Sequence, residues 1–341
     1  MRVLIIKLTS MGDLMHAFPA LTDAARIYPD IQFDWVVDES FSAVPKWHPN
    51  VDKVIKTAHR RWRKHPLKTL MNGEWKAFHR QLNLSQYDFI IDLQSNLKSA
   101  FVSWLRHGSV CGFDRKTCRE WPAHWAYKKH YFVEKNQHAI QRQRELFAQV
   151  LGYECPAKQA EYGADLSVCR KPDFALPANF LVFVHNASWS TKLWPVSNWR
   201  QLVELATKAG YSVLLPSGNE AERLRAEMIT DGYASATALP KLPLDETAVI
   251  MSSAKAAVCS DTGLAHLSAL TGTPSITLYG ATDTHLIGTF GHNQEHLIAD
   301  VDCSPCYSRK CFHKSSANNE AFCMKNFSAD DVWQQLKLLL D

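Results

Sequence analysis

A carboxylate with catalytic potential, Asp13, stands in a polar segment that follows an aliphatic run. The run covers Val3 to Ile6, and Asp13 comes after it beside Gly12, where a helix is predicted to begin at Leu14. A carboxylate in such a turn can act as a general base. It can equally cap the following helix, which is the more common role by position alone.

A second segment suited to chemistry reads Asp261-Thr-Gly-Leu-Ala-His266 and follows the apolar residues Val258 to Ser260. It offers backbone amides, a hydroxyl and an imidazole at a predicted helix start, and helix N-termini bind phosphate readily. Gly263 allows a close backbone approach. A glycine-bearing cap followed by a buried histidine would give the same pattern, so the segment alone does not decide.

Lys192 lies in a loop of the same half of the chain, and its ammonium could neutralise a departing diphosphate. A single loop lysine is usually just solvated, but this one accompanies a hydroxyl, an acid and a helix start. No Gly-x-Gly-x-x-Gly follows the first predicted strand, which counts against a dinucleotide dehydrogenase. No Gly-x-x-x-x-Gly-Lys occurs, which counts against an ATPase.

A basic segment contains Arg60, Arg61, Arg63 and Lys64 around Trp62, and Lys68 follows it. Arginine forks suit carboxylates and phosphates, although a charge run of this kind is often only a solvated surface. A noncatalytic nucleic-acid-binding protein is a third reading, because basic residues around an aromatic can hold phosphates and stack on a base. The short patch and the net charge of +4 argue against it, and we expect no nucleic-acid partner.

Four of the nine cysteines, Cys303, Cys306, Cys311 and Cys323, crowd into one stretch. The first residues include only four consecutive apolar positions before Lys7, which is too short for a secretion signal, so we expect a cytoplasmic chain. Such a compartment favours thiols or metal ligands over disulfides. The spacing departs from the usual zinc pattern, so we favour structural cysteines, reduced or locally paired, and keep structural zinc as the alternative.

The length of 341 residues favours two hydrophobic cores. Short apolar runs alternate with helical patterns in both halves, which is typical of parallel sheets covered by helices. We expect domains at 1–170 and 171–325, and a C-terminal helix at 326–341 that packs back on the first domain. In this α/β fold, ligands bind beyond the carboxyl ends of the strands. The predicted strands are Val3 to Ile6, Phe33 to Val37, Phe89 to Leu93, Phe180 to His185, Tyr211 to Leu215, Ala256 to Ser260 and Ser275 to Tyr279.

Taken together, these motifs resemble the lipopolysaccharide heptosyltransferases of glycosyltransferase family 9, and the resemblance extends over almost the whole chain. Its most specific parts are Lys7-Leu-Thr-Ser-Met-Gly-Asp13 with His16 and Pro19, Lys192-Leu-Trp-Pro195, and Ser260-Asp-Thr-Gly-Leu-Ala-His266. The resemblance implies the GT-B architecture, in which two Rossmann-like, doubly wound parallel-sheet domains face a cleft. The first domain would hold the acceptor and the second the nucleotide sugar.

The family resemblance also implies the reaction and its residues. Asp13 would be the general base that deprotonates an acceptor hydroxyl, with Lys192 as the second catalytic residue. The acceptor would meet Ser10, Gly12, Arg60, Arg61, Arg63, Lys64, Lys98 and Arg119. The nucleotide sugar would meet Ser188, Lys192, Glu222, Leu242, Asp261, Thr262, Gly263 and His266.

By the same resemblance the donor is ADP-heptose and the acceptor is the inner Kdo of Kdo-lipid A, with inversion at the anomeric carbon and no required cofactor or metal. The chain would work as a peripheral protein at the cytoplasmic face of the inner membrane, with a monomer favoured. The arginine-rich segment is similar to enzymes that add the first heptose, whereas the cysteine cluster is similar to enzymes that add the second. A GT-B nucleotide-sugar epimerase is the remaining alternative.

Overall fold

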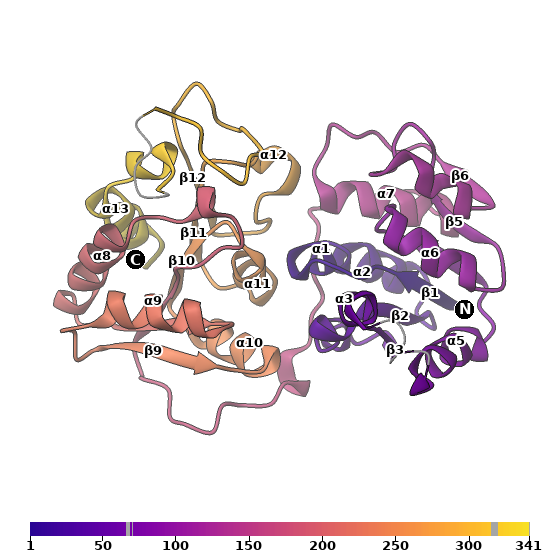
Figure 1. Cartoon of the computed structure of the whole chain (residues 1–341), viewed down its shortest axis with the longest axis horizontal. Coiled ribbons are helices and arrows are strands. Elements are labelled where there is room, and N and C mark those ends of the chain that lie inside the picture. Colours follow the sequence, from indigo (N-terminus) through magenta and orange to yellow (C-terminus); the bar gives the residue numbers. More distant parts are fainter. Residues whose placement is uncertain (66–68, 70, 315–319, 341) are drawn as a thin grey trace. The chain divides into compact units, whose positions relative to one another are not determined.

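The computed structural model describes residues 1–65, 69, 71–314 and 320–340. The chain divides into two compact units, Met1–Val168 and Cys169–Asp341, drawn in indigo to magenta and in pink to yellow in Figure 1. The expected boundary after residue 170 lies close to this division. Lys68 of the basic segment falls outside the described residues.

The first unit is built on a six-stranded parallel sheet with the order β3-β2-β1-β4-β5-β6. Its strands are β1 Arg2–Ile6, β2 Gln32–Asp38, β3 Val51–Thr57, β4 Phe89–Asp92, β5 Val110–Phe113 and β6 Lys129–Tyr131. Its α-helices are α1 Met11–Met15, α2 Phe18–Ile27, α3 His59–Lys64, α5 Glu74–Leu84, α6 Leu97–Leu105 and α7 Ala139–Leu151. Its 3-10 turns are η1 Glu39–Phe41, η2 Val44–Trp47, η3 Trp121–Ala126 and η4 Leu166–Val168.

Both faces of this sheet are covered by helices, and residues of the central strands β1 and β2 pack against them. Leu4 and Ile6 belong to an apolar cluster with Phe78 of α5, and the neighbouring strand sends Phe33 to Phe147 of α7, with 6.1 Å between ring centroids. A strand that is apolar at successive positions is expected where helices cover both faces.

The second unit repeats this plan with the order β12-β11-β10-β7-β8-β9. Its strands are β7 Phe180–Val184, β8 Ser212–Ser217, β9 Ala236–Lys241, β10 Ala256–Ser260, β11 Ser275–Tyr279 and β12 Gln294–Ile298. Its α-helices are α8 Val196–Lys208, α9 Glu220–Thr230, α10 Leu244–Ser253, α11 Gly263–Thr271, α12 Thr284–Ile287 and α13 Ala329–Leu340, and its 3-10 turns are η5 Ser190–Lys192 and η6 Phe322–Asn326.

Counted within each unit, both sheets have the strand order 3-2-1-4-5-6 of the doubly wound Rossmann fold. The expected α/β fold class is therefore confirmed. In such sheets the connections leave the first and fourth strands in opposite directions, and the crevice between those strands is the usual ligand position. The two crevices here lie at the carboxyl ends of β1 and β4 and of β7 and β10.

One expectation about helices needs correction. Helix α1 begins at Met11 rather than Leu14, so Asp13 lies inside its first turn. Helix α13 belongs to the second unit, where Val332, Trp333 and Leu336 join the core formed with α8. Its expected packing on the first domain stays a prediction. Within the ranges described, no helix is both long enough and apolar enough to cross a membrane.

Candidate active site

The crevice of the first unit is organised by the loop that links β1 to α1. Lys7 directly follows β1, and its buried ammonium donates a hydrogen bond to the carbonyl of Leu93 beyond β4, at 3.2 Å. The side-chain carbonyl of Gln94 accepts from the backbone amides of Leu8 at 2.6 Å and Thr9 at 3.1 Å. These contacts tie the loop to the end of β4 and fix the direction in which α1 begins.

Asp13 is held at this crevice by Ser10. One carboxylate oxygen, Oδ2, accepts from the Ser10 backbone amide at 3.0 Å and from the Ser10 hydroxyl at 2.8 Å. Burial opposes the ionised carboxylate, but the Lys7 ammonium, the Ser10 hydrogen bonds and the Arg119 guanidinium together outweigh it and lower the pKa of Asp13. The carboxylate thus caps α1 and is also ionised, half-buried and available at its other oxygen.

Lys7 is a further functional candidate, to which the sequence assigned no role beyond its place in the segment from Lys7 to Asp13. Only 5% of the residue is exposed. Burial lowers the pKa of Lys7 to about 8, against the opposing pull of Asp13. The sequence could have identified it, because Lys7 directly follows the apolar run Val3 to Ile6. A charged residue at that position lies at the carboxyl end of a strand, where ligands bind in such sheets.

The predicted acceptor cations come from several neighbouring strand ends of this unit. Helix α3, with Arg60, Arg63 and Lys64, follows β3, while Lys98 follows β4 and Arg119 follows β5. All five side chains are exposed. Arg119 lies close enough to affect the charge of both Lys7 and Asp13. Among residues that the structure describes, Arg60, Arg63 and Lys64 have no carboxylate at ion-pair distance.

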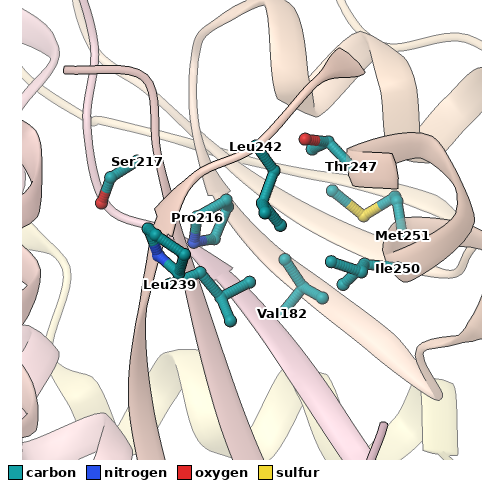
Figure 2. Close-up of a pocket in the computed structure, with 9 residues that line it drawn as sticks. Val182, Pro216, Ser217, Leu239, Leu242, Thr247, Ile250 and Met251 are labelled. Carbon is teal, nitrogen blue, oxygen red and sulfur yellow. The ribbon is translucent and has the colours of Figure 1, made fainter. Parts of the chain in front are cut away.

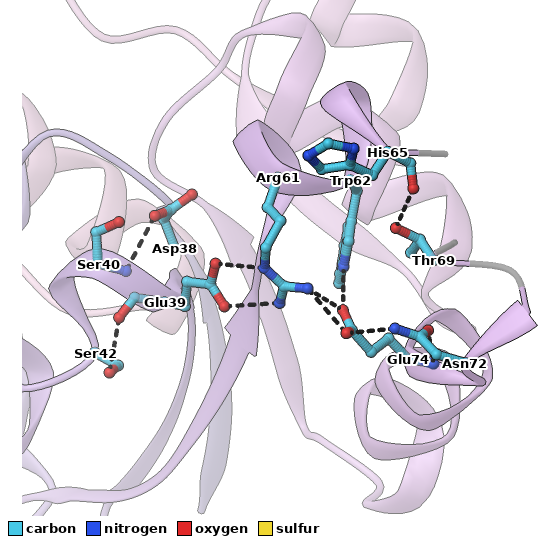
Figure 3. A network of polar contacts seen from close by, with 10 residues as sticks. All are labelled: Asp38, Glu39, Ser40, Ser42, Arg61, Trp62, His65, Thr69, Asn72 and Glu74. Atoms are coloured by element: carbon cyan, nitrogen blue, oxygen red, sulfur yellow. Dashed lines mark hydrogen bonds and ion pairs between the residues drawn. The ribbon is translucent and has the colours of Figure 1, made fainter. Parts of the chain in front are cut away.

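Arg61 has a different environment, which Figure 3 shows. Its guanidinium binds both oxygens of Glu39, at 3.1 and 2.9 Å, and both oxygens of Glu74, at 2.9 and 2.7 Å. Glu74 also accepts from the indole of Trp62 at 2.9 Å. Hydrogen bonds to Glu39 and Glu74 raise the pKa of Arg61. Arg61 therefore links η1, α3 and α5, and its donors are already directed at protein carboxylates.

The crevice of the second unit contains a direct ion pair. Lys192 Nζ lies 2.5 Å from Asp261 Oδ2, and the exposed side-chain fractions are 12% for Lys192 and 5% for Asp261. The same Asp261 oxygen accepts from the Thr282 hydroxyl. The Lys192 ammonium also lies 4.6 Å from the centroid of the Trp189 ring, a geometry typical of a cation–π contact. Trp189 and Thr282 received no role from the sequence.

The start of α11 adjoins this ion pair. Thr262 is the N-cap residue of the helix and Gly263 its first residue, both half-buried. The structure shows no capping hydrogen bond from the Thr262 side chain. His266 lies on the first turn and is buried. Ser188, in the loop after β7, is exposed.

Glu222 is engaged at the start of α9. Its carboxylate accepts from the Gly218 backbone amide at 2.7 Å and from the Asn219 side chain at 2.7 Å, while the Glu222 amide donates to Asn219 at 3.1 Å. This is a reciprocal capping arrangement. A ribose contact by Glu222 would have to be made by a carboxylate that already orients the helix.

Leu242 lines an apolar pocket at the carboxyl ends of β8 and β9 (Figure 2). The lining comprises Val182, Pro216, Ser217, Leu239, Pro240, Leu242, Thr247, Ile250 and Met251. The space inside it is about 10 Å³, roughly that of one water molecule, so the lining offers an apolar surface rather than a cavity for a ligand. The pocket and the Lys192–Asp261 pair are therefore two separate features of the same sheet edge.

The cysteine cluster forms part of the packing of the second unit. Cys323 is buried, Cys311 is half-buried against the same core, and Cys303 and Cys306 are exposed. Burial and the neighbouring thiols raise the pKa of Cys323 to about 11. Asp300 and Asp302 form an Asp-x-Asp sequence nearby. In the part of the chain that the structure describes, no three His, Cys, Asp or Glu side chains are grouped so as to hold a metal ion.

Comparisons with known proteins identify the family of this chain. Residues 75–317 match the model of glycosyltransferase family 9, described as heptosyltransferase. The chain is 41% identical over 350 residues to lipopolysaccharide heptosyltransferase 1 of Pseudomonas aeruginosa, covering 100% of this chain and 98% of the relative. Lipopolysaccharide heptosyltransferase 2 of Escherichia coli is only 22% identical, over 86% of each chain.

Solved structures give the same result. The E. coli heptosyltransferase WaaC with ADP superposes with a TM-score of 0.87 at 38% identity, covering 99% of this chain and 100% of that one. The same enzyme with ADP-2-deoxy-2-fluoro heptose gives a TM-score of 0.83, with 99% of each chain covered. The chain is therefore a glycosyltransferase and belongs to glycosyltransferase family 9, the heptosyltransferase family.

Proposed function

We propose that this chain acts as lipopolysaccharide heptosyltransferase I and transfers heptose from ADP-heptose to the inner Kdo of Kdo-lipid A. The observation that carries the proposal is the ionised, half-buried Asp13 at the β1/β4 crevice, with Arg119 beside it and further cations on neighbouring strand ends. The much higher identity to a heptosyltransferase 1 than to a heptosyltransferase 2 supports addition of the first heptose.

Asp13 is the proposed general base. The carboxylate takes the proton of the acceptor hydroxyl while the hydroxyl oxygen bonds to the anomeric carbon of the heptose, and the bond from that carbon to the diphosphate breaks. Attack from the face opposite the leaving group inverts the anomeric configuration. An anionic acceptor near Asp13 raises its pKa again and so makes it a better base as the substrate binds.

The second unit is the proposed site of the donor and the leaving group. Lys192 and the amides of Thr262 and Gly263 offer positive charge to the diphosphate as negative charge builds up on it. Asp261 is proposed to accept hydrogen bonds from hydroxyls of the sugar, and Leu242 is proposed to pack against the adenine. The structure of WaaC with ADP, at 38% identity, supports an ADP-linked donor.

The acceptor is proposed to meet the first unit through cations. Arg60, Arg63, Lys64 and Lys98 are exposed, and arginine forks match the carboxylate of Kdo and the phosphates of lipid A. Because that acceptor is embedded in a bilayer, we propose that the enzyme works at the cytoplasmic face of the inner membrane.

An acceptor panel tests this function. Purified protein is given ADP-heptose with Kdo-lipid A, with Kdo-lipid A that already carries one heptose, or with no acceptor, and ADP release is followed. We expect release only with the first. Release only with the heptose-bearing acceptor would assign heptosyltransferase II. Conversion of the nucleotide sugar without any acceptor would identify an epimerase instead.

A further inference from the structure

Helix α6 of the first unit exposes an apolar face to solvent. Leu97, Phe101 and Trp104 follow one another at spacings of four and three residues, so they share one side of the helix. Their exposed fractions are 52%, 40% and 57%. The apolar stripe of a surface helix normally faces the core. The side of this helix that faces the core is already formed by Ser99, Ala100, Val102 and Ser103. The exposed apolar side is therefore not explained by folding.

The turn η3 packs along α6 and adds two more exposed aromatics. Trp121 is 50% exposed and Trp125 is 62% exposed, and their rings touch edge to face with 5.0 Å between centroids. The guanidinium of Arg115 lies 5.4 Å from the Trp121 ring centroid. We call the exposed residues of α6 and η3 together the α6–η3 face.

Positive charge is concentrated on the same stretch of chain. Residues 97–131 contain seven Lys or Arg and two Asp or Glu, a net charge of +5, whereas the whole chain carries +4. One of the two acids, Glu120, accepts from the Leu97 backbone amide at 2.8 Å. The Phe101 ring lies 6.5 Å from the ring of His59, the first residue of the basic helix α3. Six of the seven cations are exposed, whereas Arg106 is buried and donates to Asn83 and Ser85. The stretch of chain that carries the exposed aromatics is thus also basic.

We infer that the α6–η3 face docks onto the surface of an anionic lipid bilayer. Tryptophan is enriched at membrane interfaces, where its ring enters the headgroup region. Lysine and arginine around such aromatics are drawn to anionic lipids. Four large aromatic side chains, each at least 40% exposed, lie on two elements that pack together, which exceeds the scattered single apolar residues of an ordinary protein surface.

The location of this face agrees with the proposed function, on which the inference rests. Lys98 on α6 and Arg119 just before η3 are exposed, and both belong also to the proposed acceptor site. Helix α6 starts directly after β4, at the crevice that holds Asp13. A bilayer bound here would present the headgroup of an embedded acceptor to the carboxylate without extracting its acyl chains.

The test uses the full chain with Trp104→Glu and Trp125→Glu combined. The matched control combines Leu224→Glu and Met228→Glu on α9 of the second unit, where the exposed fractions are 50% and 60%. Co-sedimentation is measured with vesicles of phosphatidylethanolamine and phosphatidylglycerol, and with vesicles of phosphatidylcholine alone. We expect the Trp pair to lower partitioning onto the anionic vesicles roughly tenfold or more, and the control pair to leave it unchanged.

The readouts separate this inference from the proposed function. Turnover of a water-soluble Kdo acceptor should be unchanged in the Trp pair, and turnover of acceptor in vesicles should fall. Vesicle binding without heptose transfer would contradict the proposed function but not the docking of the α6–η3 face. If the Trp pair and the wild type bind anionic vesicles equally, the inference is overturned. It is also overturned if the α9 control pair loses as much vesicle binding as the Trp pair. A concentration-dependent dimer that the Trp pair abolishes without lipid would assign the face to a second copy.

If the Trp pair fails to fold, the inference is tested instead by quenching of wild-type tryptophan fluorescence with brominated anionic lipid. Quenching that grows with vesicle concentration is the expected result. Fluorescence that ignores brominated lipid at saturating vesicle concentration overturns the inference.

Discussion

The two units place a lysine and an aspartate at equivalent crevices, but they hold them differently. In the first unit, Lys7 and Asp13 both follow β1 and influence each other through space, while Ser10 supplies the hydrogen bonds to the carboxylate. In the second, Lys192 follows β7, Asp261 follows β10, and the two form a direct ion pair of 2.5 Å. In the first unit, one carboxylate oxygen of Asp13 stays available to accept a proton. In the second unit, the Lys192 ammonium is held by Asp261, at a position where it can bind an anionic ligand.

The largest expected effect separates the two aspartates. Asp13→Asn should lower kcat roughly 100- to 10,000-fold, because an amide cannot take the acceptor proton, and should leave nucleotide-sugar binding intact. Asp261→Asn should mainly raise KM for the nucleotide sugar. Steady-state kinetics with both substrates, together with titration calorimetry of ADP-heptose, checks both. Retained turnover in Asp13→Asn would remove the base assignment.

The next effect concerns the buried ion pair. Lys192→Met leaves the buried Asp261 carboxylate without its cation, so the free energy of unfolding should fall by about 3 kcal/mol. ADP binding should weaken as well, because the diphosphate loses its ammonium. Urea unfolding and ADP titration measure the two quantities. The double variant Lys192→Met with Asp261→Asn should recover much of the stability and none of the ADP affinity.

The equivalent change in the first unit should have the opposite sign for stability. The pKa of Lys7 is lowered from 10.5 to about 8 mainly by burial, so the charged form costs stability at neutral pH. Lys7→Met should therefore raise the free energy of unfolding, by at most about 3 kcal/mol. It should also move the acid limb of the kcat/KM profile to higher pH, because Asp13 loses the cation that lowers its pKa. A destabilised Lys7→Met would contradict this account.

The pH dependence gives an independent check of the sign. Between the pKa of about 8 in the folded chain and the ordinary 10.5, the unfolded chain binds more protons than the folded one. Wild-type stability from this group therefore rises with pH across that window. The advantage of Lys7→Met should shrink over the same window in urea unfolding experiments.

The smallest effect distinguishes two arginines of α3. Arg63→Ala should raise KM for the acceptor about threefold at low salt, and less at high salt where exposed charges are screened. Arg61→Ala should act mainly through structure, since it releases Glu39 and Glu74 and should speed hydrogen exchange in α3 and α5. Identical kinetic and exchange behaviour of the two variants would show that Arg61 has no separate structural role.

Much of the fold could be predicted from the sequence. The predicted strands at Val3 to Ile6 and at Ala256 to Ser260 coincide with β1 and β10 to within a residue, because a run of apolar, β-branched residues has few alternatives to a strand covered on both faces. The short strands β5 and β6 and the edge strands β3, β9 and β12 were missed. Strand β5 is buried throughout but only four residues long and contains Gly112. The other four have few apolar residues mixed with polar ones, as is normal where solvent reaches a sheet.

The sequence by itself determined the fold class, the family and the segments at the strand ends, since each depends on local pattern or on a motif. Only the tertiary structure decided what those side chains do. Arg61 and Arg63 stand two positions apart with the same chemistry, yet one is held by two carboxylates brought from η1 and α5 and the other faces solvent. Lys7 acquires its lowered pKa from burial, and α6 leaves its aromatic side uncovered, because both depend on neighbours that are distant in the chain.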